Sequence, residues 1–571
     1  MQMLPKRILA LTAALQATAA LGSPTGKCPL AVTLEDYGTF TSTIISETLS
    51  ENPLPKPVDA WLGIDYATQP TGNRRFRPVT PPVAFDGIKA ANTYGKICVQ
   101  PTQLVDLALQ DEACLNFNVY RTQGVPLGEK LPVLVWIHGG SFNTGSYKSF
   151  DGAAFAAASE QPIVVVNFHY RLNALGFLSS ALMEEEDLLN PGLMDQHLFL
   201  QFVQKHIGAF GGDPDRVTLG GRSAGAHATG LHYFHNYAIG DGDDDDERAS
   251  PNKPLFAGAI HLSGSVTARA LPNATYPLYE QQMDEFMSRL GCSHGSDVPN
   301  QESLACLRDA DIDDIRAIGF ALFLKHNAAL TWPFQPAQGG FLIEKFGSQS
   351  GYDGTFFHVP TITTTTTNEG RAFTPGNLET NEEWLDYLHN ISPDLTDDDL
   401  ALLEDLYPDP VTEPDSPYAH SPLSTQYERI SAAWSDYAYL CPSQETAQVV
   451  SRAGVPVYKL RFNTNQTFPA WQGIPHSADT MYTWDDPEVQ HPEIGEMYHA
   501  YLASFVASGD PNTHRRKGTP KWPLYEPQQG GNKMPKQLVV QPGNTKVERD
   551  DVRTNACQFW RDPARQSRLN K

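Results

Sequence analysis

Two serines stand in the pattern Gly-x-Ser-x-Gly, which is typical of a nucleophilic serine on a sharp turn between a strand and a helix. Ser223 follows the strand-like run 216–219 and precedes a helix-compatible run, 224–234. Ser293 follows a helix-like segment and leads into polar residues, with Cys292 inside its motif. Because the turn requires a strand before the serine and a helix after it, the sequence predicts Ser223 as the nucleophile and Ser293 as a chance match.

A serine nucleophile needs a neighbouring base and hydrogen-bond donors for the negative charge that develops on the attacked carbonyl oxygen. The glycine pair Gly139-Gly140 comes directly after the predicted strand 131–137. Glycine has no Cβ, so the backbone N–H groups there can approach a substrate closely. We therefore predict an oxyanion hole formed by the backbones of Gly139, Gly140 and Ala224. Without Ser223, the same glycines would indicate only a tight turn.

The elements that must position these residues alternate between strand and helix. Apolar, β-branched runs that predict strands occupy residues 131–137, 163–168, 216–219, 257–262, 359–367 and 455–462. An amphipathic helix is expected between residues 196 and 210. Continuous apolar strands separated by helical segments favour an α/β fold, with a central, mostly parallel sheet covered by helices on both faces. No internal repeat or long linker interrupts residues 23–571, which predicts a single domain.

The N-terminus has the pattern of a secretory signal peptide over residues 1–22. Lys6 and Arg7 precede an apolar run, 8–20, and small residues follow, with a cut expected near Gly22–Ser23. A run of thirteen residues is too short to cross about 30 Å of hydrocarbon as a helix. We therefore expect an exported protein without a transmembrane segment.

Composition narrows the classes of partner. Lys and Arg total 42 against 66 Asp and Glu, a formal charge of −24 that disfavours binding to nucleic acid or anionic membranes. The acidic run 241–247 lacks the spacing of a calcium loop and is interpreted as a solvated insertion rather than a cation site. No clustered Cys/His spacing indicates a metal site, and no cofactor is expected. The oligomeric state is left open.

Seven cysteines suit an oxidising compartment. Close spacing suggests the pairs Cys98–Cys114 and Cys292–Cys306, although spacing alone leaves connectivity open. If the chain is exported, three Asn-x-Ser/Thr sequons become candidate glycosylation sites. They are Asn273, Asn390 and Asn465.

Several short sequence motifs follow one another between Gly63 and Trp560. They are residues 63–67, 75–76, 111–119, 170–172, 176–178, 190–196 and 210–214. Together with Ser223 and the glycine loop, they resemble the type-B carboxylesterase family, which includes cholinesterases and some fungal lipases. The resemblance implies the α/β-hydrolase fold and serine-dependent hydrolysis of small-molecule or lipid-like carboxylic esters.

The resemblance also implies the other two members of a catalytic triad. Asn368-Glu369-Gly370 with Phe373 is similar to the block that carries the acid, and residues 473–479 are similar to the block that carries the base. The acid is then Glu369 and the base His476. His227, four residues after Ser223, is expected to have a packing role. The family pattern further implies a third disulfide, Cys441–Cys557, which leaves Cys28 over.

One departure from the family concerns specificity. The residue before the nucleophile is usually glutamate in this family, but here it is Arg222. We hypothesise that Arg222 disfavours cationic alcohols and tolerates or prefers carboxylate-bearing esters, with an internal ion pair as the alternative. The loop between Cys98 and Cys114 has fifteen residues and no tryptophan, which argues against choline esters because a quaternary ammonium needs an aromatic face.

Three functions remain in order of preference. The first is a secreted carboxylic-ester hydrolase acting on small or medium, uncharged or acidic esters. The second is a lipase or sterol esterase with a preference for long acyl chains. The third is a non-catalytic binding or adhesion module of the same fold, which predicts damage to the triad that this sequence does not show.

Overall fold

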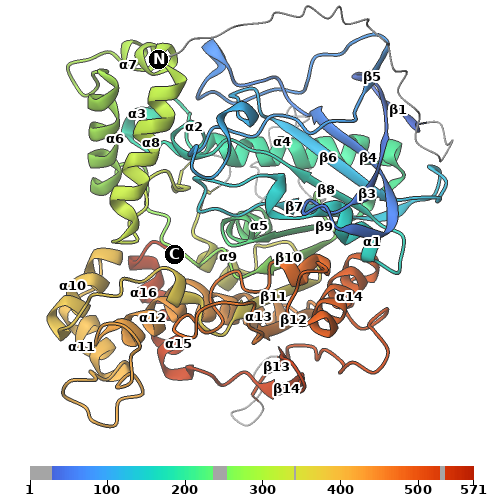
Figure 1. Ribbon diagram of the computed structural model, residues 1–571. Helices are drawn as coiled ribbons and strands as arrows, with labels where there is room; N and C mark the ends of the chain where they lie inside the picture. Colours follow the sequence, from blue (N-terminus) through green and yellow to red (C-terminus); the bar gives the residue numbers. More distant parts are fainter. Residues whose placement is uncertain (1–28, 236–253, 340–342, 527–533) are drawn as a thin grey trace, which may run out of the picture.

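The computed structural model describes residues 29–235, 254–339, 343–526 and 534–571 (Figure 1). The predicted signal peptide 1–22, Cys28 and the acidic run 241–247 therefore lie outside the described residues.

The described chain builds an eleven-stranded sheet in the order β14-β13-β12-β11-β10-β9-β7-β8-β6-β4-β3, beside a small sheet of order β1-β2-β5. From β13 to β8 every neighbouring pair is parallel, and the strands at both ends pair antiparallel. The strands are β1 (Ala31–Leu34), β2 (Gly38–Thr41), β3 (Thr43–Glu47), β4 (Pro53–Asp65), β5 (Ile88–Ala90), β6 (Asn116–Thr122), β7 (Leu131–Ile137), β8 (Val164–Phe168), β9 (Gly212–Arg222), β10 (Gly258–Leu262), β11 (Thr361–Thr366), β12 (Val457–Phe462), β13 (Lys536–Val540) and β14 (Lys546–Arg549).

Helices cover the sheet and extend beyond one end of it, where α6, α7, α8, α10 and α11 lie in Figure 1. The helices are α1 (Gly152–Ala158), α2 (Asn173–Phe177), α3 (Ala181–Glu185), α4 (Pro191–His206), α5 (Ala224–Phe234), α6 (Pro277–Leu290), α7 (Asn300–Asp309), α8 (Ile312–Asn327), α9 (Gly347–Asp353), α10 (Asn381–Ile391), α11 (Asp397–Leu406), α12 (Tyr427–Ser435), α13 (Cys441–Arg452), α14 (Pro492–Ser508), α15 (Thr554–Trp560) and α16 (Pro563–Arg568). Short 3₁₀ turns include η2 (Leu107–Leu109), η4 (Ile207–Phe210), η5 (Glu369–Ala372) and η7 (Met481–Trp484), and η6 (Asp436–Leu440) is a π-helical turn.

The central strands are apolar throughout because both of their faces are buried. In β7, Val133 and Val135 face a core shared with α4 and α5, whereas Leu134 and Trp136 face a second core shared with α1 and α14. A third core joins α10 to α13 with α15. The prediction of an α/β fold with helices on both faces of a mostly parallel sheet is confirmed.

The predicted strands agree with the structure except at their ends. The run 131–137 coincides with β7, and the other five overlap β8, β9, β10, β11 and β12. Strand β9 extends from Gly212 to Arg222, beyond the predicted 216–219, because Gly220 and Gly221 continue the pairing with β7 and β10. The predicted helix begins earlier, at Pro191 of α4, and its last turn is the 3₁₀ helix η4. Among the described residues no helix is long and apolar enough to cross a membrane.

Candidate active site

Ser223 occupies the junction between β9 and α5. Its backbone has φ 57° and ψ −127°, a conformation that residues other than glycine rarely adopt and that often marks functional sites. Its N–H donates to the Leu262 carbonyl at 2.9 Å, and its own carbonyl accepts from His227 N–H at 2.9 Å. Ser223 is partly exposed, whereas its neighbours Arg222 and Ala224 are buried. The strained turn therefore presents this serine at the carboxyl edge of the parallel sheet.

The glycines around Ser223 are required by packing. A Cβ on Gly221 would lie 2.4 Å from the Gly225 carbonyl carbon, and one on Gly225 would lie 2.1 Å from the Ile137 oxygen. In the loop after β10, a Cβ on Gly264 would lie 2.8 Å from the backbone oxygen of Ser223. Helix α5 can thus begin directly against the end of β7 only because these side chains are absent.

The glycine loop after β7 lies against the Ser223 turn. A Cβ on Gly139 would meet the Arg222 oxygen at 2.6 Å and the Ser223 Cβ at 3.1 Å. Gly140, Ser141 and Phe142 follow with φ of 116°, 55° and 60°. Glycine adopts a positive φ freely, but Ser141 and Phe142 store conformational strain there, as residues of functional loops commonly do.

The orientation of the loop is fixed by a tight turn and by the helix that starts beside it. The Gly140 carbonyl accepts from Asn143 N–H at 3.0 Å and from Thr144 N–H at 2.9 Å. Ala224 is the first residue of α5, where a backbone N–H has no partner within the helix. Gly139 and Gly140 are partly exposed. The three predicted donors therefore lie around one partly exposed serine.

Glu369 and His476 form a close pair. His476 Nδ1 lies 2.6 Å from Glu369 Oε2, and Glu369 Oε1 accepts from Thr366 N–H at 2.7 Å. Glu369 is 1 % exposed and the His476 side chain 7 %. His476 Nε2 is buried and has no hydrogen-bond partner among the described residues. The arrangement holds the imidazole by one nitrogen and leaves the other available for proton transfer.

This pair lies at the same edge of the sheet as Ser223. Ser223 is bonded to the end of β10 through Leu262, and Ser263 N–H donates to Thr364 of β11 at 3.0 Å. Glu369 begins η5 directly after β11. Parallel strands end at the same edge, so Ser223 and Glu369 follow strands that are near neighbours in the sheet.

Asn368 connects the acid-bearing segment to the histidine-bearing segment. Its N–H donates to the Ile474 carbonyl at 2.9 Å, and its side-chain oxygen accepts from Ile474 N–H at 3.0 Å. The His476 ring packs against both Phe373 and Tyr439, with ring centroids 5.0 and 4.7 Å away, and these two rings stack on each other. The imidazole is thereby fixed by backbone bonds and by aromatic contact.

His227 has the surroundings of a packing residue. Its ring lies between Phe142 and Tyr439, with centroids 6.5 and 6.4 Å away. Burial, assisted by the positive charge of Arg269, lowers the pKa of His227 to about 3, so its imidazole is neutral at physiological pH. These contacts support the expectation that His227 packs against the site rather than serving as its base.

Arg222 is buried and paired inside the protein. Its Nε lies 3.2 Å from Asp479 Oδ1, and its guanidinium also donates to Thr483 Oγ1. The side chain is 7 % exposed, and that of Asp479 is 1 % exposed. This geometry supports the internal ion pair over the hypothesis of a substrate-binding arginine.

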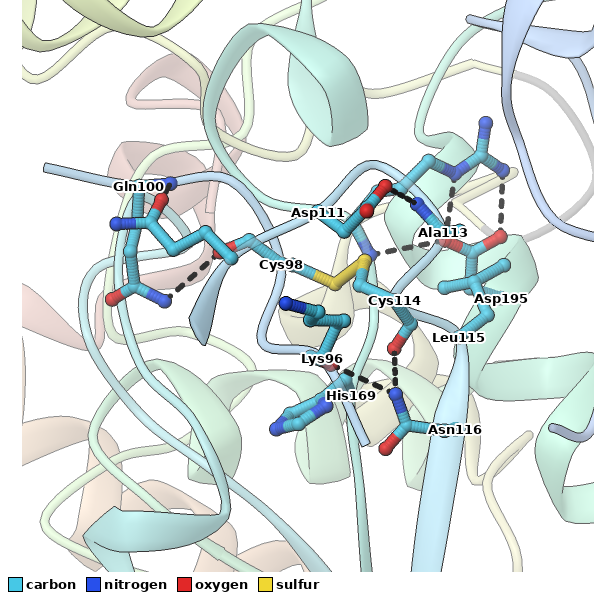
Figure 2. The surroundings of a disulfide bond; sticks show 12 residues. Lys96, Cys98, Gln100, Asp111, Ala113, Cys114, Leu115, Asn116, His169 and Asp195 are labelled. Carbon is cyan, nitrogen blue, oxygen red and sulfur yellow. Dashed lines mark hydrogen bonds and ion pairs between the residues drawn. A yellow bond between two sulfur atoms is a disulfide. The ribbon is translucent and has the colours of Figure 1, made fainter. Parts of the chain in front are cut away.

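The described part of the chain contains three disulfides: Cys98–Cys114, Cys292–Cys306 and Cys441–Cys557. Figure 2 shows the first, with the amide of Asn116 bonded to the Cys114 and Lys96 carbonyls below it. Gln100, two residues after Cys98, exchanges hydrogen bonds with Gly145 at 2.9 and 3.0 Å. The disulfide loop is thus attached to the segment that follows the glycine loop.

The remaining predicted positions lie away from this centre. Ser293 is exposed in the loop after α6, next to the disulfide-bonded Cys292, which agrees with its interpretation as a chance match. Among the sequons, Asn273 and Asn390 are exposed and Asn465 is partly exposed. Their glycosylation stays a prediction.

Sequence reasoning did not assign roles to Asn368, Gln100 or Asp479. Each acts through a contact with a residue distant in the sequence, so spacing gave no signal for them. Asn368 and Asp479 do belong to the two blocks that carry the acid and the base. Position within those blocks was therefore the one available indication of their importance.

Comparison with known proteins agrees with this geometry. The model of the carboxylesterase family matches residues 45–560. "Secreted lipase 4" of Gibberella zeae is 60 % identical over 541 residues, which cover 95 % of this chain and 94 % of that protein. "Lipase 4" of Diutina rugosa is 29 % identical over 83 % of this chain and 88 % of its own. The crystal structure of Aspergillus niger EstA matches with a TM-score of 0.79 and 26 % identity, covering 95 % of this chain and 99 % of that one.

Proposed function

Because the chain belongs to the carboxylesterase family and is a serine-dependent carboxylic ester hydrolase, we propose that it acts through an acyl-enzyme on Ser223. His476 Nε2 takes the hydroxyl proton as Ser223 attacks the ester carbonyl. His476 then gives that proton to the leaving alcohol. A water molecule, activated by the same imidazole, releases the acid and restores Ser223.

Glu369 and the loop donors have separate parts in this proposal. Glu369 holds the His476 Nδ1–H and stabilises the imidazolium that forms during attack. The N–H groups of Gly139, Gly140 and Ala224 stabilise the developing oxyanion, and removing one such donor typically costs on the order of 10²–10³ in rate. The observation that carries the proposal is the 2.6 Å contact between His476 Nδ1 and Glu369, with Nε2 left free of protein partners among the described residues.

Hydrolysis of a p-nitrophenyl ester series from acetate to palmitate tests this proposal. Ser223→Ala should abolish turnover at every chain length, while Ser293→Ala, in the other Gly-x-Ser-x-Gly motif, should retain it. Circular dichroism and thermal unfolding establish that both variants are folded. Unchanged turnover by folded Ser223→Ala would refute the assignment.

Uncharged esters fit the surroundings of the site best. Phe373 and Tyr439 contact His476 from a stacked pair of rings, and Phe142 follows the glycines of the loop. The positive charge of Arg222 is paired with the Asp479 carboxylate. An apolar boundary with an internally paired arginine favours neutral acyl and alcohol groups over charged ones.

A lipase is the second candidate, and two observations favour it. The relative from Gibberella zeae carries the name of a lipase. The disulfide loop also exposes three leucines, Leu104, Leu107 and Leu109, with exposed fractions of 62, 48 and 40 %. Leucines presented to solvent on a loop attached to the active site could bind a lipid surface. A rate maximum at long acyl chains in the same ester series would assign this activity.

Export to the extracellular space is also proposed. The sequence pattern of residues 1–22 supports it, as do the three disulfides and the printed name of the Gibberella zeae relative. Expression in a fungal host, followed by N-terminal sequencing of protein from the medium, should give a mature chain that starts near Ser23. Retention of residues 1–22 in a protein that stays inside the cells would contradict the proposal.

A further inference from the structure

The buried ion pair between Arg222 and Asp479 joins the two segments that carry the proposed nucleophile and base. Arg222 directly precedes Ser223, and Asp479 follows His476 by three residues. The two side chains come from positions 257 residues apart and meet with N–O separation of 3.2 Å. Each partner of the ion pair is therefore close in the sequence to one of the two reacting residues, Ser223 or His476.

Further bonds fix both partners in place. Tyr498 OH donates to Asp479 Oδ2 at 2.9 Å, so each carboxylate oxygen has its own donor. Thr483, whose hydroxyl accepts from Arg222, also donates its N–H to the Asp479 carbonyl at 3.1 Å. The Arg222 guanidinium lies 5.9 Å from the Trp136 ring centre. A charge pair with satisfied hydrogen bonds is a rigid connection in a buried setting.

The Glu369 side of the site is connected in a different way. Asn368 and Glu369 bind the histidine segment through Ile474 and His476. Those bonds relate the base to the acid but do not involve the serine segment. The Arg222–Asp479 pair is the contact that links the Ser223 turn directly to the segment that carries His476.

We propose that Arg222 and Asp479 are positioning residues, which set the relation of His476 to Ser223 and keep the local charge balanced. This inference rests on the proposed triad and replaces the substrate-binding role hypothesised for Arg222. Catalytic rate depends steeply on such geometry, and a displacement of 1 Å can cost about 10²-fold. Loss of the pair should therefore lower kcat by about 10- to 100-fold while KM changes little.

Removing one charge of the pair should shift the pH–rate profile, and the sign of the shift should depend on which charge is removed. A purely structural role predicts no such dependence on sign. Arg222→Gln leaves the Asp479 carboxylate unbalanced, which favours a protonated His476, so the acidic limb of the pH–rate profile should move to higher pH. Asp479→Asn leaves the Arg222 cation unbalanced, so that limb should move to lower pH. Glu369, Tyr439 and His227 are titratable groups near His476, and the charged Arg371 donates to the Trp471 carbonyl of the histidine-bearing segment. All four variants described here retain these groups.

Two further variants separate positioning from folding. The double variant Arg222→Gln/Asp479→Asn removes both charges, so the local net charge is the same as in the wild type. Its kcat should stay low, but the acidic limb of its pH–rate profile should lie at the wild-type pH. Arg222→Lys keeps the charge and should recover part of kcat and the wild-type limb. A matched control is Asp550→Asn, which removes the partner of Lys459 in a second ion pair inside the protein. This control should lower the thermal midpoint without changing kcat per folded molecule.

The measurement is kcat, KM and the pH–rate profile on p-nitrophenyl butyrate, with active enzyme counted by burst titration. Opposite displacements of the acidic limb in the two single variants, with reduced kcat, would support the inference. Wild-type kcat and profiles in folded Arg222→Gln and Asp479→Asn would overturn it. A failure of the triad itself would instead appear as activity in Ser223→Ala, so the two failures are distinguishable.

Discussion

The Nδ1 nitrogen of His476 lies 2.6 Å from Oε2 of Glu369, and the second carboxylate oxygen is held by the backbone of Thr366. Both oxygens of a buried acid are therefore satisfied, one by the main chain and one by the imidazole. The pair converts a flexible histidine into one with a fixed ring plane and a fixed tautomer, which is the state that a general base for Ser223 requires.

Replacing Glu369 by glutamine tests this relationship. Glu369→Gln keeps the size of the side chain but removes the charge that stabilises the imidazolium, so kcat should fall by about 10³–10⁴-fold. Glu548→Gln, which removes the charge of a partly exposed carboxylate on β14 paired with Arg461, is the matched control and should leave kcat unchanged. A loss below 10-fold in folded Glu369→Gln would be inconsistent with its proposed role.

The glycine loop should not tolerate a side chain at Gly140. In Gly140→Ala the new Cβ would lie 2.2 Å from the Thr144 oxygen, at a φ of 116° that alanine adopts only with strain. The loop must shift, and kcat should fall by about 10²–10³-fold. Gly128→Ala is the control, because a Cβ there has no neighbour within 4 Å. Equal activity of the two alanine variants would argue against an oxyanion hole in this loop.

Two of the disulfides should have different effects. Cys441–Cys557 should affect stability alone, whereas Cys98–Cys114 should affect both stability and activity. Cys441–Cys557 closes a loop with a sequence separation of 116, against 16 for Cys98–Cys114. Replacing each pair by serine should cost about 4–5 and about 3 kcal/mol of unfolding free energy, respectively. Since Gln100 ties the shorter loop to Gly145, only its opening should also reduce kcat. Denaturant titration and kinetics of the two double variants measure both effects.

Buried histidines should make stability fall in mild acid. Burial lowers the pKa of His261 to about 4, below its unfolded value of 6.5. Between these values the unfolded chain binds the proton and the folded chain does not, so the free energy of unfolding rises with pH by up to about 1.4 kcal/mol per unit for this group. His261→Gln should therefore flatten the stability curve between pH 4 and 6.5. The exposed His389→Gln should leave its slope unchanged, and identical slopes in all three proteins would contradict the effect.

The central strands and the position of Ser223 were predictable because local sequence determines them. Strands buried on both faces are continuous apolar runs, and the Gly-x-Ser-x-Gly turn needs small residues at fixed places. The antiparallel strands β3, β4 and β6 were not predicted. Strand β4, for example, begins Pro53-Leu54-Pro55 and carries no continuous apolar run. The disulfide Cys441–Cys557 followed from the family resemblance alone, because its half-cystines are far apart in the chain.

Contacts between segments that are distant in the chain could not be predicted from the sequence. The ion pair of Arg222 with Asp479 and the bonds of Asn368 with Ile474 depend on how β9, β11 and the histidine segment meet in space. The sequence marked Arg222 as unusual and offered two explanations for it. The choice between them required the position of its partner.

The most direct test of the central claim is to locate the covalent adduct of a fluorophosphonate, which reacts with an activated serine. Peptide mapping by mass spectrometry should place one adduct per molecule on Ser223, with none on Ser293. His476→Ala should slow labelling by at least about 10³-fold. An adduct on another serine, or labelling that is equally fast in folded His476→Ala, would contradict the account.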